Sequence, residues 1–491
     1  MKAATFTPCV DGRYLLLTYN QKQNYKEISR FSKRDADAFP RDFVDLLLSP
    51  TSKVEMLDDW NSIGNEISLA ASCLAWNWDS GISISIPGSN STTDVLKATL
   101  AGDAIIGSMA SIHAPGSGYV LLHHVMGNTD GERNVWSHVE GGMGSVSSAI
   151  SKAAREVGAH IVTNAEVSQL MIEDSGVVNG VLLEDGTQVY SSVVLSNATP
   201  YKTFMELVPQ NVLPDDFFHA IKNIDYKSNQ ELGLYPLQGT TKINVAVDKL
   251  PEFQCYKFNH PEAGPHHTAT IHIGTDRNLG VKPFPSFQLL GPVLFHETLF
   301  DIQDDGTTTP AYISSVDILS MEEIGLACQD AWNGLSSRRP VIEMTIPSSL
   351  DKTISPPGKH VVSLFTQYTP YNLTDGSWED PAYRESYAKR CFNLIDEYAP
   401  GFSSSVIGYD MLAPPDLERV IGLTGGNIFH GAMSLDSLFL MRPVKGWSGY
   451  RTPVRGLYLC GSGTHPGGGV MGAPGRNSAQ VVIQDLKKYY V

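Results

Sequence analysis

One stretch near the end of the chain restricts the possible folds more than any other. Residues 456–477 read GLYLCGSGTHPGGGVMGAPGRN, a short apolar run followed by seven glycines from Gly461 to Gly475. Glycine lacks a Cβ atom, so the backbone of this segment can approach a flat or charged ligand closely. The sequence predicts a strand at 457–459, a glycine-rich turn, and a helix that begins close to Pro474. The residues expected to face inward on this helix are Ala479, Val482, Ile483 and Leu486.

The glycine-rich segment also contains a match to a dinucleotide-binding motif. Residues 467–472, GGGVMG, satisfy GxGxxG, but the motif requires an acidic residue on a second strand about 20 positions further on. Only 19 residues follow Gly472 in the 491-residue chain, which argues against that interpretation. A strand, a turn and a helix N-terminus still direct unpaired N–H groups at one place, which suits an anion or a cofactor. The alternative is a glycine-rich loop that only closes a sheet.

Composition and charge exclude several classes of protein. The chain has 491 residues, enough for about two or three domains. Its formal net charge of −16 argues against nucleic acids and anionic membrane surfaces as partners. The six cysteines include no CxxC pair, which argues against a zinc site, a thioredoxin-like redox couple and a disulfide framework. No apolar run approaches the ~20 residues that a membrane-spanning helix requires.

A helix and a series of short strands are expected in the first half of the chain. Residues 141–144, GGMG, open a helix that we expect to end at Gly158. Its apolar stripe consists of Met143, Val146, Ile150, Ala153 and Val157. Short strands are expected at residues 160–163, 165–173, 177–183, 187–190 and 192–197, with tight turns at 174–176 and 184–186. A glycine-started helix that leads into such a meander is a specific arrangement.

Periodicity predicts further elements outside this region. Alternating or apolar runs indicate strands at 13–19, 241–250, 268–274, 339–347 and 360–368, and helical spacing indicates helices at 383–398 and from Pro414. Residues 277–315 show no periodicity, and we expect an insertion there. His123 and His124 are adjacent, so their side chains point in different directions. A structural role is therefore favoured over a metal site for this pair, and no metal site is expected elsewhere.

Several of these motifs together resemble one known family. The run GLYLCGSGTHPGGGVMG is similar to the C-terminal signature of the carotenoid/retinoid oxidoreductases, which include the bacterial-type phytoene desaturases. Supporting matches, in chain order, are the GGMG helix with its meander, VVLSN at 193–197, PDLE at 415–418 and YRTP at 450–453. The resemblance covers most of the chain, and the ordered series is more specific than any single match.

The resemblance implies a fold of the amine-oxidase type, α/β plus α+β, with two domains. An FAD domain would be assembled from residues 136–203 and 414–491. A substrate domain with an antiparallel sheet and helices would comprise residues 1–135 and 204–413. In members of the family, a βαβ unit with GxGxxG on the FAD pyrophosphate precedes these segments. We find no such unit here, so the Rossmann-type FAD domain is expected to be incomplete and this chain to bind FAD weakly or not at all.

The resemblance also places individual residues at the cofactor. Val167, on the second strand of the meander, corresponds to the residue whose backbone meets the adenine. His465 has two interpretations, because it could hold a proton near the flavin or only hydrogen-bond the turn. The residues expected along the ribityl chain and the isoalloxazine are Gly461, Ser462, Gly463, Gly469, Val470 and Met471.

The expected activity follows from the same resemblance. An FAD-dependent oxidoreductase would add or remove hydride at carbon, on a small and apolar substrate. The alternative is a non-catalytic regulatory or interaction protein of mitochondria that keeps the fold without firm FAD binding and engages a mitochondrial protein partner. The resemblance further suggests the mitochondrial matrix as the location, although residues 1–20 show no targeting segment.

Overall fold

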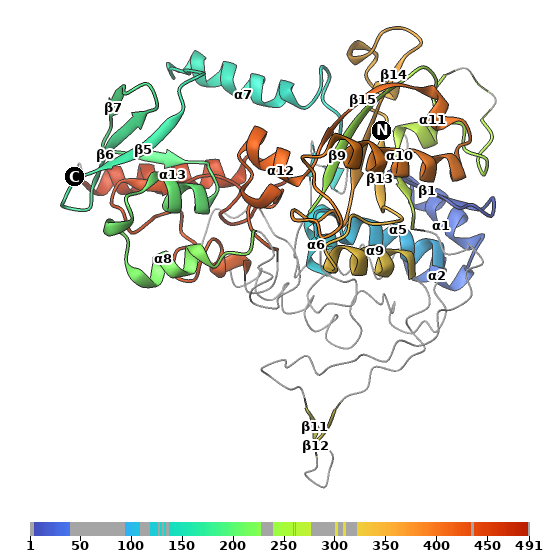
Figure 1. The fold of residues 1–491 in the computed structure, drawn as a ribbon, viewed down its shortest axis with the longest axis horizontal. Helices are drawn as coiled ribbons and strands as arrows, with labels where there is room; N and C mark the ends of the chain where they lie inside the picture. The colour runs from blue at the N-terminus through green and yellow to red at the C-terminus, as the bar shows by residue number, and fades with distance from the viewer. Residues whose placement is uncertain are drawn as a thin grey trace.

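The computed structural model describes thirteen stretches of the chain, which form two bodies of secondary structure joined near α12 (Pro414–Asp416) (Figure 1). The expected insertion at 277–315 and the segment 40–93 lie largely or wholly outside the described residues. The described stretches are 4–39, 94–108, 118–125, 128–129, 132–133, 137–226, 239–258, 260, 262–275, 300–302, 308–310, 322–433 and 437–489.

The larger body is built on a seven-stranded sheet with the order β15-β9-β14-β13-β10-β1-β2. All neighbouring pairs are antiparallel except β1 and β10, which are parallel. The structure confirms the five predicted strands and adds β1 and β15, which the sequence did not indicate. The strands are β1 (Thr5–Pro8), β2 (Tyr14–Leu17), β9 (Thr241–Val247), β10 (Thr270–Ile273), β13 (Ile342–Thr345), β14 (His360–Thr366) and β15 (Val406–Leu412).

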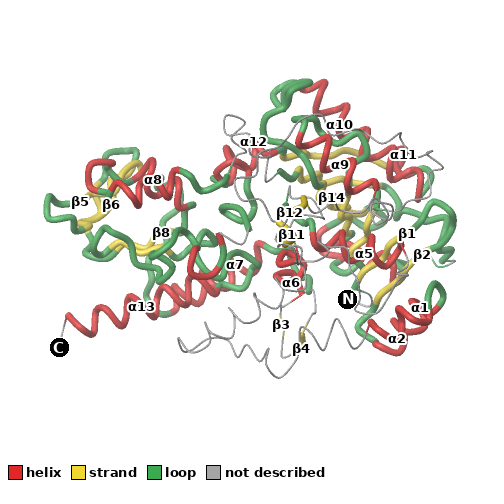
Figure 2. The backbone as a smooth tube through the Cα atoms, turned by 90° about the horizontal axis from the view of Figure 1, so that it is seen from below, coloured by secondary structure: helices red, strands yellow, loops and turns green. Residues whose placement is uncertain are grey.

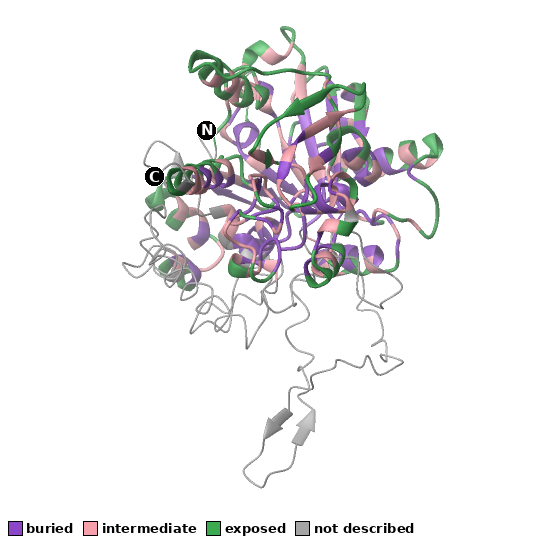
Figure 3. Ribbon diagram, turned by 90° about the vertical axis from the view of Figure 1, so that its left-hand side faces the viewer, coloured by how far each residue is buried: buried purple, intermediate pink, exposed green. Residues whose placement is uncertain are grey.

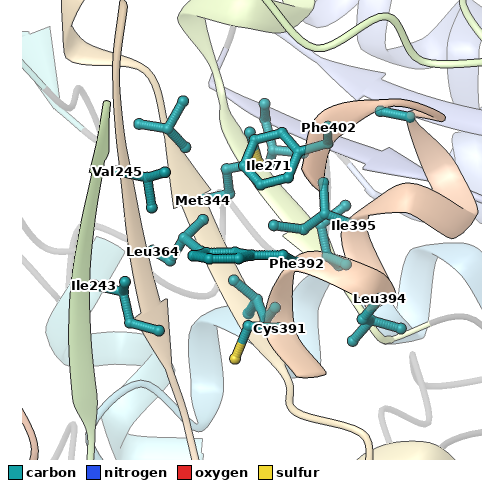
Figure 4. Close-up of a cluster of buried hydrophobic side chains, with 14 of the residues drawn as sticks. Ile243, Val245, Ile271, Met344, Leu364, Cys391, Phe392, Leu394, Ile395 and Phe402 are labelled. Atoms are coloured by element: carbon teal, nitrogen blue, oxygen red, sulfur yellow. The ribbon is translucent and has the colours of Figure 1, made fainter. Parts of the chain in front are cut away.

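One face of this sheet packs against α10 (Pro381–Tyr398), the helix predicted at 383–398. The helix begins where predicted because Asp380 caps it, its carboxylate accepting from the N–H of Ala382 at 2.9 Å, and because Pro381 is favoured in the first turn. Alternate strand residues point toward α10, since side chains alternate between the two faces of a strand. Figure 4 shows Ile243, Val245, Met344 and Leu364 facing Phe392 and Ile395 across this core.

A second set of helices packs beside the sheet with a core of its own. Its buried residues include Leu15, Ile28, Leu96, Ala101 and Ile324. The helices are α1 (Gln21–Ser29), α2 (Lys33–Phe39), α5 (Asp94–Ala104), α6 (Gly118–Val125) and α9 (Glu322–Trp332). None of the helices that the structure describes is long and apolar enough to cross a bilayer.

The smaller body, at the other end of the molecule (Figure 2), contains the meander and the chain end. Strands β5 (Val167–Ile172), β6 (Val178–Leu183) and β7 (Gln188–Tyr190) form an antiparallel sheet, and β8 (Val194–Ser196) pairs in parallel with β16 (Leu457–Leu459). The core of this body contains Leu457 and Leu459 together with Phe204 and Phe217. Phe204 and Phe217 lie beyond residue 203, where the FAD-domain segment was expected to end. The helix α8 (Asp215–Lys222) supplies Phe217.

The strand predicted at 160–163 is wrong. These residues form no strand, Asn164 adopts a φ of 55°, and Val162 is 76% exposed. A short run of β-branched residues forms a strand only when a neighbouring strand accepts its hydrogen bonds and covers its side chains. The predicted strands 165–173, 177–183, 187–190 and 192–197 are confirmed in shortened form as β5 to β8.

The helix α7 (Gly144–Glu156) was predicted correctly, but its apolar stripe is not covered. Gly158 follows its end with a φ of 92°, as expected for a helix stop. No residue of α7 is buried, and Met143, Ile150 and Val157 are 49%, 63% and 87% exposed. Figure 3 shows that buried residues gather between the sheets and their helices, while outer helices are exposed.

One edge of β8 also lacks a partner. Among the described residues, β8 pairs with one strand only, β16.

Candidate functional site

The glycine-rich turn lies directly between β16 and α13 (Ala473–Tyr489), as the sequence predicted. All three residues of β16 are buried, and the N–H of Cys460 extends the pairing by donating to the carbonyl of Ser196 at 2.8 Å. A Cβ atom on Gly461 would lie 2.4 Å from the carbonyl oxygen of Asn197. A Cβ on Gly463 would lie 2.3 Å from Cδ of Pro200. Glycine is therefore required at both positions because the backbone of the turn lies against the end of β8.

The far side of the turn is open. Gly467, Gly469 and Gly472 have φ values of 103°, 140° and 68°, which favour glycine. Val470 has a φ of 58° and is 71% exposed, and Met471 is 52% exposed. The first N–H groups of α13 lack partners within the helix, so the turn places hydrogen-bond donors beside an uncovered surface.

The inward face predicted for α13 is partly wrong. Val482 is buried, but Ile483 is 51% exposed, Ala479 is exposed and Leu486 is only half-buried. Pro474, Ser478 and Val482 form the buried face instead. These three positions follow a spacing of four residues, which also lies on one side of a helix. The apolar residues Ala479 and Ile483 lie on a side that is uncovered in the structure.

A buried arginine holds the glycine-rich turn in place by hydrogen bonds to main-chain carbonyls. Arg442 is 2% exposed, and its Nη2 donates to the carbonyl of Ser462 at 2.9 Å and also to the carbonyl of Phe429. Its Nη1 lies 3.4 Å from the carbonyl of Ala432. Hydrogen bonds from a charged donor are stronger than neutral ones. Arg442 therefore fixes the glycine-rich turn relative to the loop at 429–432.

Two histidines from distant segments lie against the same turn. Cβ of His430 is 3.7 Å from the position that a Cβ on Gly463 would occupy, and Cε1 of His123 is 3.8 Å from the equivalent position at Gly467. Burial, followed by the nearby charge of Arg442, lowers the pKa of His430 to about 4. Burial, followed by His124 and Arg442, lowers the pKa of His123 to about 4. Both imidazoles are therefore neutral at pH 7 and can serve as neutral hydrogen-bonding groups.

The neutral state of His430 gives stability a predictable pH dependence. Its folded pKa of about 4 lies below its ordinary value of 6.5, so the folded protein binds fewer protons and loses stability as the pH falls through this window. We expect His430→Asn, which tolerates the positive φ, to reduce this loss by up to about 1.4 kcal/mol per pH unit. Urea unfolding at several pH values measures the effect, with the exposed His160→Asn as the control. If the free energy of unfolding changed equally with pH in the two variants, His430 would not be a buried neutral histidine.

His465 lies within the turn, and its main-chain carbonyl accepts a hydrogen bond that stabilises the turn. The hydroxyl of Tyr450 donates to the carbonyl of His465 at 2.7 Å and accepts from Nδ2 of Asn477 at 2.9 Å. The ring of His465 lies 6.0 Å from that of Phe439, centroid to centroid. These contacts tie the turn to the first turns of α13. A role of His465 in proton transfer stays a prediction.

The structure brings together some of the predicted site residues and separates one. Gly461, Ser462, Gly463, Gly469, Val470 and Met471 all belong to the single turn before α13. Val167 lies in β5 and pairs with Leu183, so it belongs to the meander sheet and not to the turn. Its role at the adenine end stays a prediction. No group of three or more His, Cys, Asp and Glu side chains in the described part of the chain could hold a metal ion.

The chain is similar in sequence to known proteins. The sequence profile of flavin-containing amine oxidoreductases matches residues 90–235. The chain is 43% identical to mouse (Mus musculus) pyridine nucleotide-disulfide oxidoreductase domain-containing protein 2 over 517 residues, which span 98% of this chain and 80% of the mouse protein. The chain belongs to this family of flavin oxidoreductases. The resemblance inferred from the glycine-rich signature is thereby confirmed.

The chain is also similar to more distant proteins. The chain is 25% identical to the lycopene-forming phytoene desaturase of Pantoea ananas over 386 residues, which span 76% of this chain and 60% of the desaturase. A double mutant of putrescine oxidase matches 98% of this chain and 82% of its own, with a TM-score of 0.50 and 12% identity. The putrescine oxidase shows the fold alone. The predicted amine-oxidase fold with mixed sheets and helices is confirmed.

Three residues that lie against the glycine-rich turn in the structure, Arg442, His123 and His430, were not among the site residues predicted from the sequence. Arg442 stands in an RP loop motif, and only its low exposure identifies it as an anchor. His123 and His430 reach the turn from α6 and from the 429–432 loop. Nδ1 of His124 lies 2.7 Å from the carbonyl oxygen of Val120 within its own helix. The structural role expected for the pair His123-His124 stays a prediction. An unusual histidine next to glycine, as in Phe429-His430-Gly431, was the one available signal.

Proposed function

We propose that this protein is an FAD-dependent oxidoreductase whose glycine-rich turn contacts the flavin end of the cofactor. The observation that carries the proposal is the structure of the turn. Arg442 holds it by a hydrogen bond to the carbonyl of Ser462, and Val470 and Met471 are exposed. The N-terminus of α13 follows directly. Bound FAD would supply the hydride-accepting ring. The N–H groups at the start of α13 would favour the negative charge that a reduced flavin carries. Gly461 to Gly463 and Gly469 to Met471 would hold this end.

We further propose that the 491 residues alone bind FAD weakly, because the pyrophosphate requires a second glycine turn at a helix N-terminus. Two uncovered features support a place for such a unit. The second edge of β8 has no strand partner among the described residues, and the stripe of Met143, Ile150 and Val157 on α7 is exposed. An added strand could pair with β8 while its helix covers apolar surface. The test uses an extended protein, in which a strand–GxGxxG–helix unit is joined to the N-terminus of the 491 residues.

A charge inserted at the open side of the turn tests the position of the flavin. Val470 is 71% exposed, so Val470→Glu should leave the fold intact. If the turn contacts the flavin, the new carboxylate repels the negative charge near the ring, and we expect FAD to bind at least about tenfold more weakly. Fluorescence titration of FAD against the extended protein measures the affinity. Gln480→Glu, at an exposed position on α13, is the control and should bind FAD like the parent protein.

The proposed substrate is a small and largely apolar molecule, in keeping with the phytoene desaturase among the relatives. Anaerobic incubation of the FAD-loaded protein with candidate substrates tests the activity, because substrate oxidation bleaches the flavin absorbance. An extended protein that does not hold FAD firmly and oxidises no candidate substrate would favour the non-catalytic alternative. The mitochondrial matrix is the proposed location, from the family resemblance, and fractionation of cells that express the protein would test it.

A further inference from the structure

A row of ionisable side chains crosses the face of the large sheet that points away from α10. Residues directly opposed in antiparallel strands share a face, and the register aligns His272 with Glu343, Glu343 with Phe365, and Phe365 with Lys242. Their neighbours Ile271, Met344, Leu364 and Ile243 point to the other face and belong to the apolar core against α10. The row therefore spans four strands, β10, β13, β14 and β9, with an aromatic ring between an acid and a lysine.

At one end of the row, His272 lies within ion-pair distance of Asp103. Nε2 of His272 lies 3.4 Å from Oδ1 of Asp103 on α5, and the side chain of His272 is 3% exposed. A Cβ on Gly102 would lie 2.7 Å from Nδ1 of His272, so glycine at this position lets the imidazole lie against the helix. Burial opposes the charged form of His272, but the interaction with Asp103 prevails and raises its pKa. Asp103 therefore attracts His272 as an ion-pair partner, although neither ring nitrogen of His272 has a hydrogen-bond partner among the described residues.

Two donors beside Phe365, the ammonium of Lys242 and the amide of Gln367, are incompletely paired. Lys242 is half-buried and donates to the hydroxyl of Ser363, and the described residues supply no carboxylate within ion-pair distance of its ammonium. Gln367, the residue after the end of β14, is 1% exposed. Its Oε1 accepts from the N–H of Gly107 at 2.8 Å. Its Nε2 is buried and has no acceptor among the described residues. Buried donors without acceptors are rare in folded proteins and call for a bound group.

Glu343 can complete this donor set. It is half-buried and makes no hydrogen bond or ion pair with the described residues. Burial raises its pKa to about 7, with Asp103 adding to the effect and His272 and Lys242 opposing it. At neutral pH its carboxyl can therefore take up a proton at small cost and donate a hydrogen bond. The ammonium of Lys242 lies 5.8 Å from the centroid of the Phe365 ring, which offers an apolar surface beside both groups.

We propose that this row, Lys242, Phe365, Gln367 and Glu343, is a binding site for a carboxylate on a molecule with an apolar body. Lys242 supplies the charge, Gln367 and protonated Glu343 donate hydrogen bonds to the carboxylate oxygens, and the Phe365 ring contacts the apolar part. A carboxylate fits better than an amine because Lys242 has no carboxylate partner and Nε2 of Gln367 has no acceptor among the described residues. That the ligand is the substrate rests on the proposed oxidoreductase function, whereas the site itself rests on the sheet alone.

Calorimetric titration of the 491-residue protein, without added FAD, tests the site with three probes that share one ring. Phenylacetate should bind, and 2-phenylethanol and 2-phenylethylamine should bind at least about tenfold more weakly, since each lacks a charge-assisted hydrogen bond. Lys242→Met should weaken phenylacetate binding by about tenfold or more, while Lys249→Met, at an exposed lysine just after β9, should not change it. Thermal melts establish that both variants are folded.

Proton uptake provides a second signature of the site. Phenylacetate raises the pKa of Glu343 further, so its affinity should increase as the pH falls from about 8 to about 6. Glu343→Gln keeps a donor but cannot titrate, so the affinity of this variant for phenylacetate should depend less on pH than that of the parent protein; the titration of His272 remains in both. Equal binding of the amine and the acid, no binding of phenylacetate, or no effect of Lys242→Met would overturn the proposal. Because FAD is absent from these titrations, a failure of the protein to bind FAD leaves their outcome interpretable.

Discussion

Replacement of Arg442 by methionine is expected to lower the free energy of unfolding by about 3 kcal/mol or more. The guanidinium is 2% exposed and donates to the carbonyls of Ser462, Phe429 and Ala432. Methionine fills much of the volume but leaves these buried carbonyls without donors, each of which costs about 1–3 kcal/mol. Equilibrium unfolding in urea measures the change, and loss of FAD affinity in the extended protein should accompany it because the turn is no longer fixed.

The control for this substitution is Arg419→Met. Arg419 also makes a salt bridge, at 2.7 Å to Asp416, but its side chain is 71% exposed. Exposed salt bridges contribute little, so we expect a change of less than about 1 kcal/mol. Similar effects of the two substitutions would contradict a buried anchoring role for Arg442.

Replacement of Gly461 by alanine is expected to destabilise the smaller body by up to about 3 kcal/mol. The new Cβ would lie 2.4 Å from the carbonyl oxygen of Asn197, and this neighbour is backbone, which cannot rotate away. The strands β16 and β8 would have to separate, although they are paired through Leu459 and Ser196 immediately before this point. Thermal unfolding followed by circular dichroism measures the loss.

Gly468→Ala is the matched substitution within the same turn. A Cβ on Gly468 would have its nearest contact, Oγ of Ser462, at 3.5 Å, which is an ordinary separation. We expect its melting temperature to stay close to that of the parent protein. If both alanine variants melted alike, the close approach of the turn to β8 would be refuted.

Local signals allowed part of this structure to be predicted. The density of glycine after an apolar triplet indicated β16, the turn and the start of α13, because each depends on neighbouring residues. The order of glycine motif, helix and meander indicated the fold family. The strands β9, β10, β13 and β14 followed from alternation, but β1 did not, since it has only four residues and ends at Pro8.

Other features depend on contacts between distant segments and could not be predicted. Which face of α13 is buried depends on what packs against it, so Ile483 was assigned inward and is exposed. The turn is supported by Arg442, His430 and His123, which reach it from three separate segments. The row of His272, Glu343 and Lys242 exists only in the register of the sheet, where strands far apart in sequence lie side by side.

The central claim is that the glycine-rich turn is the flavin-contacting half of a divided FAD site. The most direct measurement is the flavin absorbance of two forms purified side by side, the 491-residue chain and the chain extended at its N-terminus by a strand–GxGxxG–helix unit. The extended form is expected to be yellow with about one FAD per chain, and the 491-residue form nearly colourless. A 491-residue form that carries stoichiometric flavin, or an extended form that carries none, would contradict the claim.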